Sequence, residues 1–244
     1  MKVTVIGYWG GFPGKNEATS GYLFQHDGFS LLVDCGSGVL SQLQNYIAIE
    51  SLDAVILSHY HHDHIADIGP LQYGRLVRTM LGECHTPLPI YGHTLDNDQF
   101  NKLTYKNYTT GIAYDPAQRL QIGPFSIEFL KTIHPAPCFA LKIGTNSSTV
   151  VYTADTSYLE NLIPFSKDAD LLIAECSFYA EQDGKNAGHL NSLDVATIAT
   201  DANVKHVLLT HLPHFGDHNQ LIKETNTKFT GKTTLASSGF VWEA

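Results

Sequence analysis

Four side chains that can bind metal ions occur within six residues of this sequence. His59, His61, Asp63 and His64 come directly after the apolar run 54–57. Imidazole and carboxylate groups packed this densely cannot all be buried without partners, because an unsatisfied polar group is costly in the protein interior. A borderline-soft divalent ion satisfies all of them at once. This short segment therefore predicts a metal site.

The spacing of these four residues favours two ions over one. His59 and His61 alternate by two, so on extended chain they point the same way and can share an ion. Asp63 and His64 are turned away from that pair and suit a second ion. Two ions about 3.5–4 Å apart need a shared anionic ligand, and Asp155 is the natural candidate.

The remaining candidate ligands share one positional feature. His134, Asp155 and His211 each follow an apolar run typical of a buried strand. Strands deliver the loops at their carboxyl ends to one edge of an α/β sheet, where such sheets place their ligands. We therefore expect these three side chains and the histidine-rich segment to serve one site.

Length and periodicity predict a large α/β protein, which we take as a single domain over residues 1–244. Short β-rich runs predict strands, and stretches with helical spacing between them predict helices. The strands are expected at 3–6, 22–25, 30–33, 54–57, 89–91, 125–130, 139–143, 149–152, 171–174 and 207–210. The helices are expected at 39–46, 67–81, 96–103, 191–202 and 220–229.

The composition excludes several classes of partner. The net charge is −9 with only 15 Lys and Arg, whereas wide contact with nucleic acid usually requires a basic excess. No apolar stretch approaches the roughly 20 residues that span a bilayer, and the first residues read as a strand, not as an export signal. The four cysteines form no Cys-x-x-Cys pair and are expected to be reduced and buried. We expect a cytoplasmic protein.

At this point the sequence resembles a known family. Residues 58–65, Ser-His-Tyr-His-His-Asp-His-Ile, fit the H-x-H-x-D-H signature of the metallo-β-lactamase fold superfamily. The later elements follow in the family's order: a lone His134, then Thr-Ala-Asp-Thr at 153–156, then Leu-Leu-Thr-His at 208–211. The resemblance implies a four-layer αββα sandwich, in which two mixed sheets are flanked by helices.

The resemblance also implies a ligand set. His59, His61 and His134 would hold one ion, Asp63, His64 and His211 would hold the other, and Asp155 would bridge the two. Zinc is the first expectation for a hydrolytic site so rich in histidine, with manganese as the alternative. Asp34 is expected to support the metal loop, because ligating histidines usually donate their second N–H to a carboxylate or carbonyl.

The segment 187–192, Ala-Gly-His-Leu-Asn-Ser, resembles the ribonuclease Z-like branch of the family. The resemblance implies a phosphodiesterase in which His189 assists the leaving group while a hydroxide shared by the two ions attacks. Asp63 would bind metal and take the proton of the attacking water, and Glu175 could orient His189. Related proteins pair, so a homodimer is expected.

One departure from that branch bears on the substrate. Only residues 135–154 separate His134 from Asp155, with room for two strands and a turn, whereas ribonucleases Z usually carry a long basic arm there. We therefore expect a small or cyclic phosphodiester as substrate. Hydrolysis of a thioester, lactone or other acyl substrate is the alternative, followed by ribonuclease Z-type RNA processing and, last, by non-catalytic metal binding. The insertion 68–103 could form a substrate lid, in which Tyr73, Arg75 and Arg78 either meet a phosphate or form a plain solvated helix face.

Overall fold

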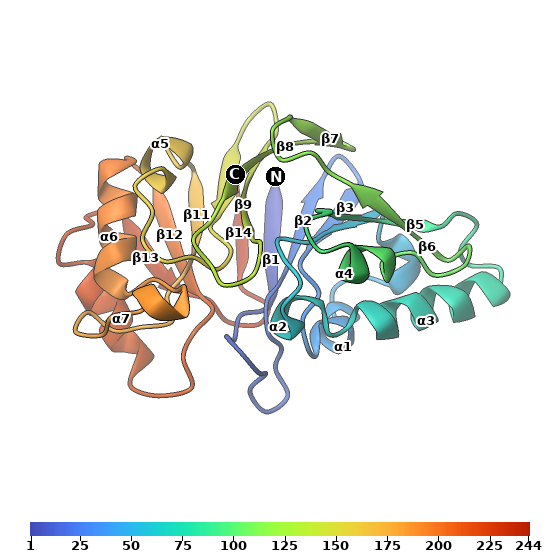
Figure 1. Ribbon diagram of the computed structural model, residues 1–244, viewed down its shortest axis with the longest axis horizontal. Coiled ribbons are helices and arrows are strands. Elements are labelled where there is room, and N and C mark those ends of the chain that lie inside the picture. Colours follow the sequence, from blue (N-terminus) through green and yellow to red (C-terminus); the bar gives the residue numbers. More distant parts are fainter. The chain divides into compact units, whose positions relative to one another are not determined.

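The computed structural model describes every residue from Met1 to Ala244. The chain forms two compact units. Unit 1 comprises Met1–Asp115, Ile122–Pro124 and Ser237–Glu243, and unit 2 comprises Pro116–Gln121, Phe125–Ala236 and Ala244. The structure contains two seven-stranded mixed sheets, which Figure 1 labels strand by strand. That residues 1–244 act as a single domain stays a prediction.

The sheet of unit 1 joins an antiparallel half to a parallel half. Its strand order is β14-β1-β2-β3-β4-β5-β6. The strands up to β3 pair antiparallel, and the strands from β3 onward pair parallel. Its strands are β1 (Lys2–Gly7), β2 (Gly21–His26), β3 (Phe29–Val33), β4 (Ala54–Ile56), β5 (Leu88–Gly92), β6 (Thr109–Ala113) and β14 (Val241–Glu243).

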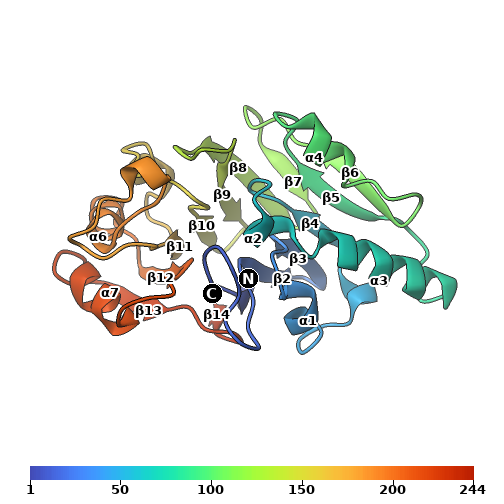
Figure 2. The ribbon, with the colours of Figure 1, turned by 60° about the horizontal axis from the view of Figure 1, so that its bottom comes forward.

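Helices of unit 1 lie beside this sheet in the turned view of Figure 2. The apolar core of unit 1 combines strand residues such as Leu32 and Val55 with helix residues such as Leu43 and Leu71. Burial of this kind is the main favourable term in folding. The helical elements are α1 (Val39–Leu43), the 3-10 turn η1 (Ile49–Ser51), α2 (His62–Ile65), α3 (Ile68–Met80) and α4 (Asn97–Asn101).

The second sheet has the same division into antiparallel and parallel halves. Its order is β13-β12-β11-β10-β9-β8-β7. The strands β8, β9 and β10 pair antiparallel, and the strands from β10 to β13 pair parallel. Its strands are β7 (Leu120–Ile122), β8 (Phe125–Lys131), β9 (Phe139–Gly144), β10 (Thr149–Tyr152), β11 (Leu171–Glu175), β12 (His206–Thr210) and β13 (Lys232–Leu235).

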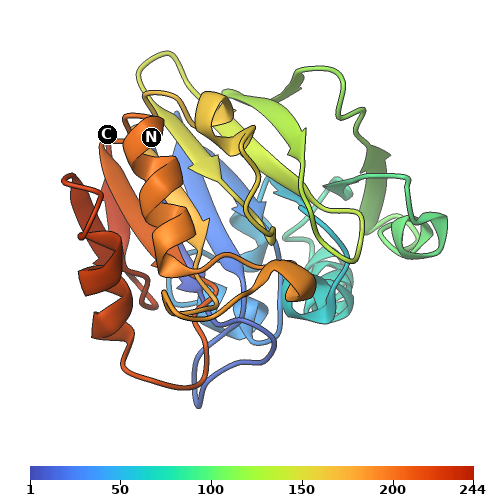
Figure 3. The ribbon, with the colours of Figure 1, turned by 60° about the vertical axis from the view of Figure 1, so that its left-hand side comes forward.

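The helices of unit 2 are α5 (Leu162–Phe165), α6 (Ser192–Asp201) and α7 (His218–Thr225), with a 3-10 turn η2 (Lys185–Ala187) ahead of α6. In Figure 3, α6 and α7 lie side by side over the parallel strands. The start of α6 is fixed by a capping box, in which the Asn191 side chain accepts from the backbone of Asp194 and the Asp194 carboxylate accepts from the backbone of Asn191.

The predicted strands and helices agree with the observed ones, and the differences lie in element boundaries and in a few short elements. All ten predicted strands and five predicted helices are present, with boundaries that shift by a few residues. Four strands (β6, β7, β13, β14) and two helices (α2, α5) were not predicted. All four cysteines are buried, as expected, and the structure contains no disulfide. No helix has the length and apolar character that crossing a lipid bilayer requires.

Candidate metal centre

The ligand loop, residues 59–64 of unit 1, begins where the buried strand β4 ends. His59 is fully buried, and His61 is the extended residue before α2. Asp63 and His64 lie on α2, a single helical turn. The ring of His59 lies 4.8 Å from that of His61 and 4.1 Å from that of His64, measured between centroids. The chain is therefore extended at His61 and helical from His62 onward, although the ring of His64 lies closer to His59 than the ring of His61 does.

Asp34 holds this loop from the end of the neighbouring strand β3. Its Oδ1 accepts the backbone N–H of Ser58 at 2.8 Å, and its Oδ2 accepts the Ser58 hydroxyl at 2.8 Å. The same Oδ2 lies 2.7 Å from Nδ1 of His64. Asp34 is completely buried, so these bonds are strong and few other groups compete for the carboxylate. The supporting contact expected for Asp34 is present.

These bonds fix which nitrogen of each imidazole carries the proton. A carboxylate only accepts, so Nδ1 of His64 donates to Asp34, and in the neutral ring Nε2 then carries the lone pair. The Ser58 hydroxyl gives its hydrogen to Asp34 and therefore accepts from Nδ1 of His59 at 3.0 Å. Nε2 of His59 then also carries a lone pair. Both tautomers are the ones that a metal ligand needs.

Two further contacts anchor the loop within unit 1. The backbone N–H of Gly11 donates to Oδ2 of Asp63 at 2.8 Å. The Tyr60 hydroxyl donates to the carbonyl of His93, directly after β5, at 2.6 Å. Burial, followed by the charge of Asp96, raises the pKa of Tyr60 well above its ordinary value, so this hydroxyl remains a donor. The loop is thus fixed from three neighbouring segments.

In unit 2 the candidate ligands come from three separate strand ends. Nε2 of His134, after β8, lies 3.7 Å from Oδ2 of Asp155, and Nε2 of His211, after β12, lies 3.4 Å from the same oxygen. Asp155 follows β10 and is 2% exposed. The structure therefore brings together all three unit 2 residues predicted as ligands.

The tautomers of these two histidines follow the same rule. Nδ1 of His134 lies 3.0 Å from the carbonyl oxygen of Gly188, so it donates. Nδ1 of His211 lies 2.8 Å from the Ser177 hydroxyl. That hydroxyl has one hydrogen, and its other neighbours are the Glu175 carboxylate and the His211 carbonyl, both of which only accept. Ser177 therefore accepts from His211, which leaves the lone pair on Nε2.

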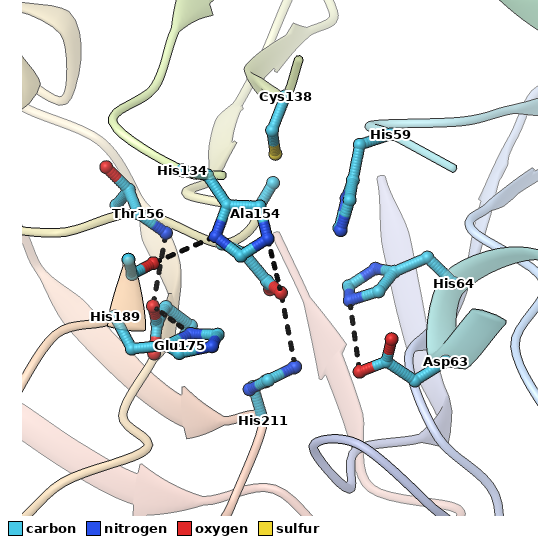
Figure 4. Close-up of polar contacts among 12 residues, drawn as sticks. His59, Asp63, His64, His134, Cys138, Ala154, Thr156, Glu175, His189 and His211 are labelled. Atoms are coloured by element: carbon cyan, nitrogen blue, oxygen red, sulfur yellow. Dashed lines mark hydrogen bonds and ion pairs between the residues drawn. The ribbon is translucent and has the colours of Figure 1, made fainter. Parts of the chain in front are cut away.

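His189 lies beside this ligand set. Its ring centroid is 5.1 Å from that of His211 and 5.3 Å from that of His134. Nδ1 of His189 lies 2.9 Å from Oε1 of Glu175, whose side chain is 1% exposed. The same carboxylate accepts the backbone N–H groups of Thr156 and Leu190, as Figure 4 shows for Thr156. Glu175 thus fixes the ring orientation of His189.

The backbone is strained where several of these side chains leave their strands. Asp34, Ala154 (directly before Asp155) and His211 have φ values of 57°, 50° and 51°. L-residues rarely occupy this left-handed region, and residues held there cluster at functional sites because the surrounding structure must impose them. Three strand ends that lead to candidate site residues thus share the same strained backbone conformation.

The donor sets of both units fit divalent metal ions. In each unit a lone-pair nitrogen faces a carboxylate oxygen: His64 faces Asp63 at 3.7 Å, and His134 and His211 face Asp155 at 3.4–3.7 Å. When the imidazole is neutral, the two acceptors repel, and a divalent cation between them turns that repulsion into attraction. Imidazole with carboxylate is a donor set that zinc and related ions prefer.

Some residues do not behave as the sequence suggested. Arg75, considered for phosphate contact or a solvated face, is buried and donates to the carbonyls of Ile49, Glu50 and Thr86. Arg78 pairs with Glu50 and Glu83. These two guanidinium groups hold α3 in place. Ser58 and Ser177 were missed by the sequence analysis, although each stands next to a predicted residue at a strand end.

Comparison with known proteins identifies the family. Residues 30–212 match the β-lactamase superfamily domain. The chain is 64% identical to the probable metallo-hydrolase YhfI of Bacillus subtilis over 243 residues, which covers 100% of both proteins. The chain therefore belongs to the metallo-β-lactamase superfamily. Within it the chain falls in the ribonuclease Z-like branch: a ribonuclease Z of Haloferax volcanii is 23% identical over 98% of this chain and 93% of its own length.

Solved structures support the fold. The crystal structure of YhfI matches with a TM-score of 0.99 and 62% identity, covering 100% of this chain and 99% of that one. The short form of human tRNase Z matches with a TM-score of 0.78 and 20% identity, covering 100% and 99%, and so shares the fold alone. The predicted fold class, a metallo-β-lactamase sandwich of two mixed sheets flanked by helices, is confirmed.

Proposed function

We propose that this protein is a dinuclear metal hydrolase that cleaves a small or cyclic phosphodiester. The ligands are those of the family signature: His59, His61, Asp63, His64, His134, Asp155 and His211. The observation that carries the proposal is His189, a general acid candidate, whose ring stacks at 5.1 Å on a proposed ligand and is oriented by Glu175. Zinc suits this imidazole-rich set first, with manganese as the alternative.

Each half of the reaction has a candidate group. Divalent ions at such a site lower the pKa of water toward neutrality and neutralise charge that develops on phosphoryl oxygens. Asp63 accepts the proton of the attacking water, and the Gly11 N–H bond to its Oδ2 holds the carboxylate in one orientation while it does so. His189 donates a proton or a hydrogen bond through Nε2 to the departing oxygen.

The acid favours a phosphodiester over a thioester. An alkoxide leaves a phosphodiester poorly unless it is protonated, whereas a thiolate leaves a thioester without help. Nδ1 of His189 is bound to Glu175 at 2.9 Å, and a carboxylate in this position stabilises the imidazolium form that donates from Nε2. A site that keeps such a group beside its metal ligands is built for a poor leaving group.

The substrate we favour is small. The chain between β8 and β10 consists of the hairpin partner β9 and short loops, with no room for a nucleic-acid-binding arm. The net charge of −9 disfavours a long polyanion. A cyclic nucleotide or a cyclic sugar phosphate fits both features.

We also propose a homodimer, which light scattering of the full chain would test.

The test is the variant His189→Ala assayed on two kinds of phosphodiester. For 3′,5′-cyclic AMP, whose leaving group is an alkoxide, kcat should fall by about 10²- to 10⁴-fold, the usual contribution of a general acid. For bis(p-nitrophenyl) phosphate the loss should be far smaller, because nitrophenolate needs no proton. Metal content measured by elemental analysis should stay at two ions per chain.

His85→Ala, at an exposed histidine of unit 1, serves as the matched control and should change neither activity. Equal losses of kcat on both substrates would show that His189 does not transfer a proton to the leaving group. Rapid turnover of a thioester or a lactone by the wild type, together with no turnover of either phosphodiester, would replace the proposal by the acyl-hydrolase alternative.

A further inference from the structure

A glycine-rich loop, residues 9–14, lies against the ligand loop of unit 1. It reads Trp-Gly-Gly-Phe-Pro-Gly and connects β1 to β2. Its Gly11 N–H donates to Oδ2 of Asp63 at 2.8 Å, and Figure 2 shows the loop passing next to α2. The loop is therefore fixed to a proposed metal ligand through its own backbone.

The base of this loop is rigid. The Glu17 carboxylate accepts the Tyr8 hydroxyl at 2.7 Å and the Trp9 indole N–H at 2.5 Å. The rings of Tyr8 and Trp9 stack at 5.2 Å. Gly14 packs so closely on Trp9 and Glu17 that a Cβ there would lie 2.4–2.9 Å from their atoms. Because the side chains at the base contact one another, only residues at the tip of the loop can present a side chain to a ligand.

The tip presents one large side chain. Phe12 is 60% exposed, and its neighbour Gly11 has φ +71° with open space where a Cβ would be. A single exposed apolar residue is ordinary on a protein surface. Phe12 differs because it directly follows the residue bonded to Asp63, and consecutive Cα atoms are only about 3.8 Å apart.

We propose that Phe12 is a specificity-determining residue that stacks on a planar ring carried by the substrate, as on a nucleobase attached to the scissile phosphate. The inference rests on the proposed function and adds the substrate class: phosphodiesters with an aromatic base bind better than those with an alkyl group. Bases commonly stack on aromatic side chains, and every base has a face that can do so. The rigid loop base holds the phenyl ring in place beforehand, which lowers the entropy lost on binding.

The test compares the metal-loaded wild type with Phe12→Ala, using AMP and inorganic phosphate as ligands in calorimetric titrations. The Kd for AMP should rise by about 5- to 150-fold, the range that one base stacked on one aromatic ring supplies. The Kd for phosphate should not change. Phe12→Tyr should keep the affinity for AMP, and Met80→Ala, at a 76% exposed residue of unit 1, should leave both constants unchanged.

Two outcomes would overturn the inference. An unchanged Kd for AMP would show that the ring makes no contact, and an equal rise for AMP and phosphate would show that the loop only supports Asp63. Wild type that binds AMP no more tightly than phosphate would also reject it. These titrations measure binding alone, so their failure is distinguishable from failure of the proposed function, which the kcat values of His189→Ala test.

Discussion

The two units supply their proposed ligands in opposite ways. Unit 1 presents four of them from the single ligand loop, residues 59–64. Unit 2 presents His134, Asp155 and His211 from the ends of three strands, β8, β10 and β12. The chemistry of the side chains is the same in both units, and in both a histidine Nε2 faces a carboxylate. What differs is how each set is held.

The support of the ligand loop is shared, and the support of the unit 2 ligands is divided. Asp34 bonds His64 directly and reaches His59 through Ser58. In unit 2, Gly188 holds His134 and Ser177 holds His211. One loop can depend on one buried carboxylate, because its members move together. Ligands that come from separate strands each need a partner of their own, so damage there should stay local.

Asp34→Asn should therefore have the largest effect. The amide that replaces one carboxylate oxygen is a donor, so it either opposes the N–H of His64 or forces that ring to protonate Nε2. Loss of the partners around ligating histidines typically lowers metal affinity by about 10- to 100-fold, and we expect the upper end because His59 is disturbed as well. Competition between the protein and a fluorescent zinc chelator measures the affinity.

Asp53→Asn is the matched control. Asp53 lies in the same unit and accepts the backbone N–H of Ser30 at 2.8 Å, but it contacts no residue of the ligand loop in this way. The affinity of the Asp53→Asn variant for zinc should equal that of the wild type. If Asp34→Asn lost no more affinity than Asp53→Asn, the shared support of the loop would be disproved.

Ser177→Ala should have a smaller effect, about 10-fold in zinc affinity, at the low end of the same range. The change removes the acceptor of the His211 N–H and leaves the Gly188 bond to His134 intact. Ser177→Thr keeps a hydroxyl in the same place and should restore the affinity. A loss as large as that of Asp34→Asn would mean that the unit 2 ligands depend on one shared network after all.

The same contrast explains what the sequence could predict. The ligand loop was found from side-chain types alone, because its members are neighbours in the chain. His134, Asp155 and His211 are single residues after strands, so their positions indicated one shared site, and only the resemblance to a family assigned His134 and His211 to particular ions. Strand and helix positions were predictable wherever apolar periodicity was long, as in β1 or α6. The edge strands β6, β7, β13 and β14 are short and half-exposed, so their patterns are weak.

Supporting residues were harder to predict than ligands. Asp34 and Glu175 were suspected because each is an acid at the end of a buried strand. Ser58 and Ser177 carry no such signal, since serine is frequent in loops, and their roles depend on a hydrogen that must go to a neighbouring carboxylate. Arg75 shows the reverse error: its positive charge suggested phosphate, but three carbonyls already use its donors. Such partners become visible only in three dimensions.

The smallest effect concerns the strand that carries His211. His206 begins β12, is 5% exposed and lies 2.9 Å from the Thr234 hydroxyl. Burial, and then the charge of Lys232, lower its pKa from 6.5 to about 4. Because the folded-state pKa is lower than that of the unfolded chain, the unfolded chain binds more protons at mildly acidic pH. The stabilising contribution is therefore complete above pH 6.5 and is lost as the pH falls toward 4.

Between pH 7 and pH 6 this single group should lower the free energy of unfolding by about 0.7 kcal/mol. Urea denaturation of the wild type and of His206→Asn at both pH values isolates the contribution of His206, because all other titrating groups are common to the two proteins. The variant should show the smaller decrease in the free energy of unfolding. Hydrogen exchange at pH 6 should place the added opening in β12 and its neighbours β11 and β13, with the ligand loop unaffected. Equal decreases in the two proteins, or faster exchange in both units alike, would show that acid does not act on the His211 strand separately.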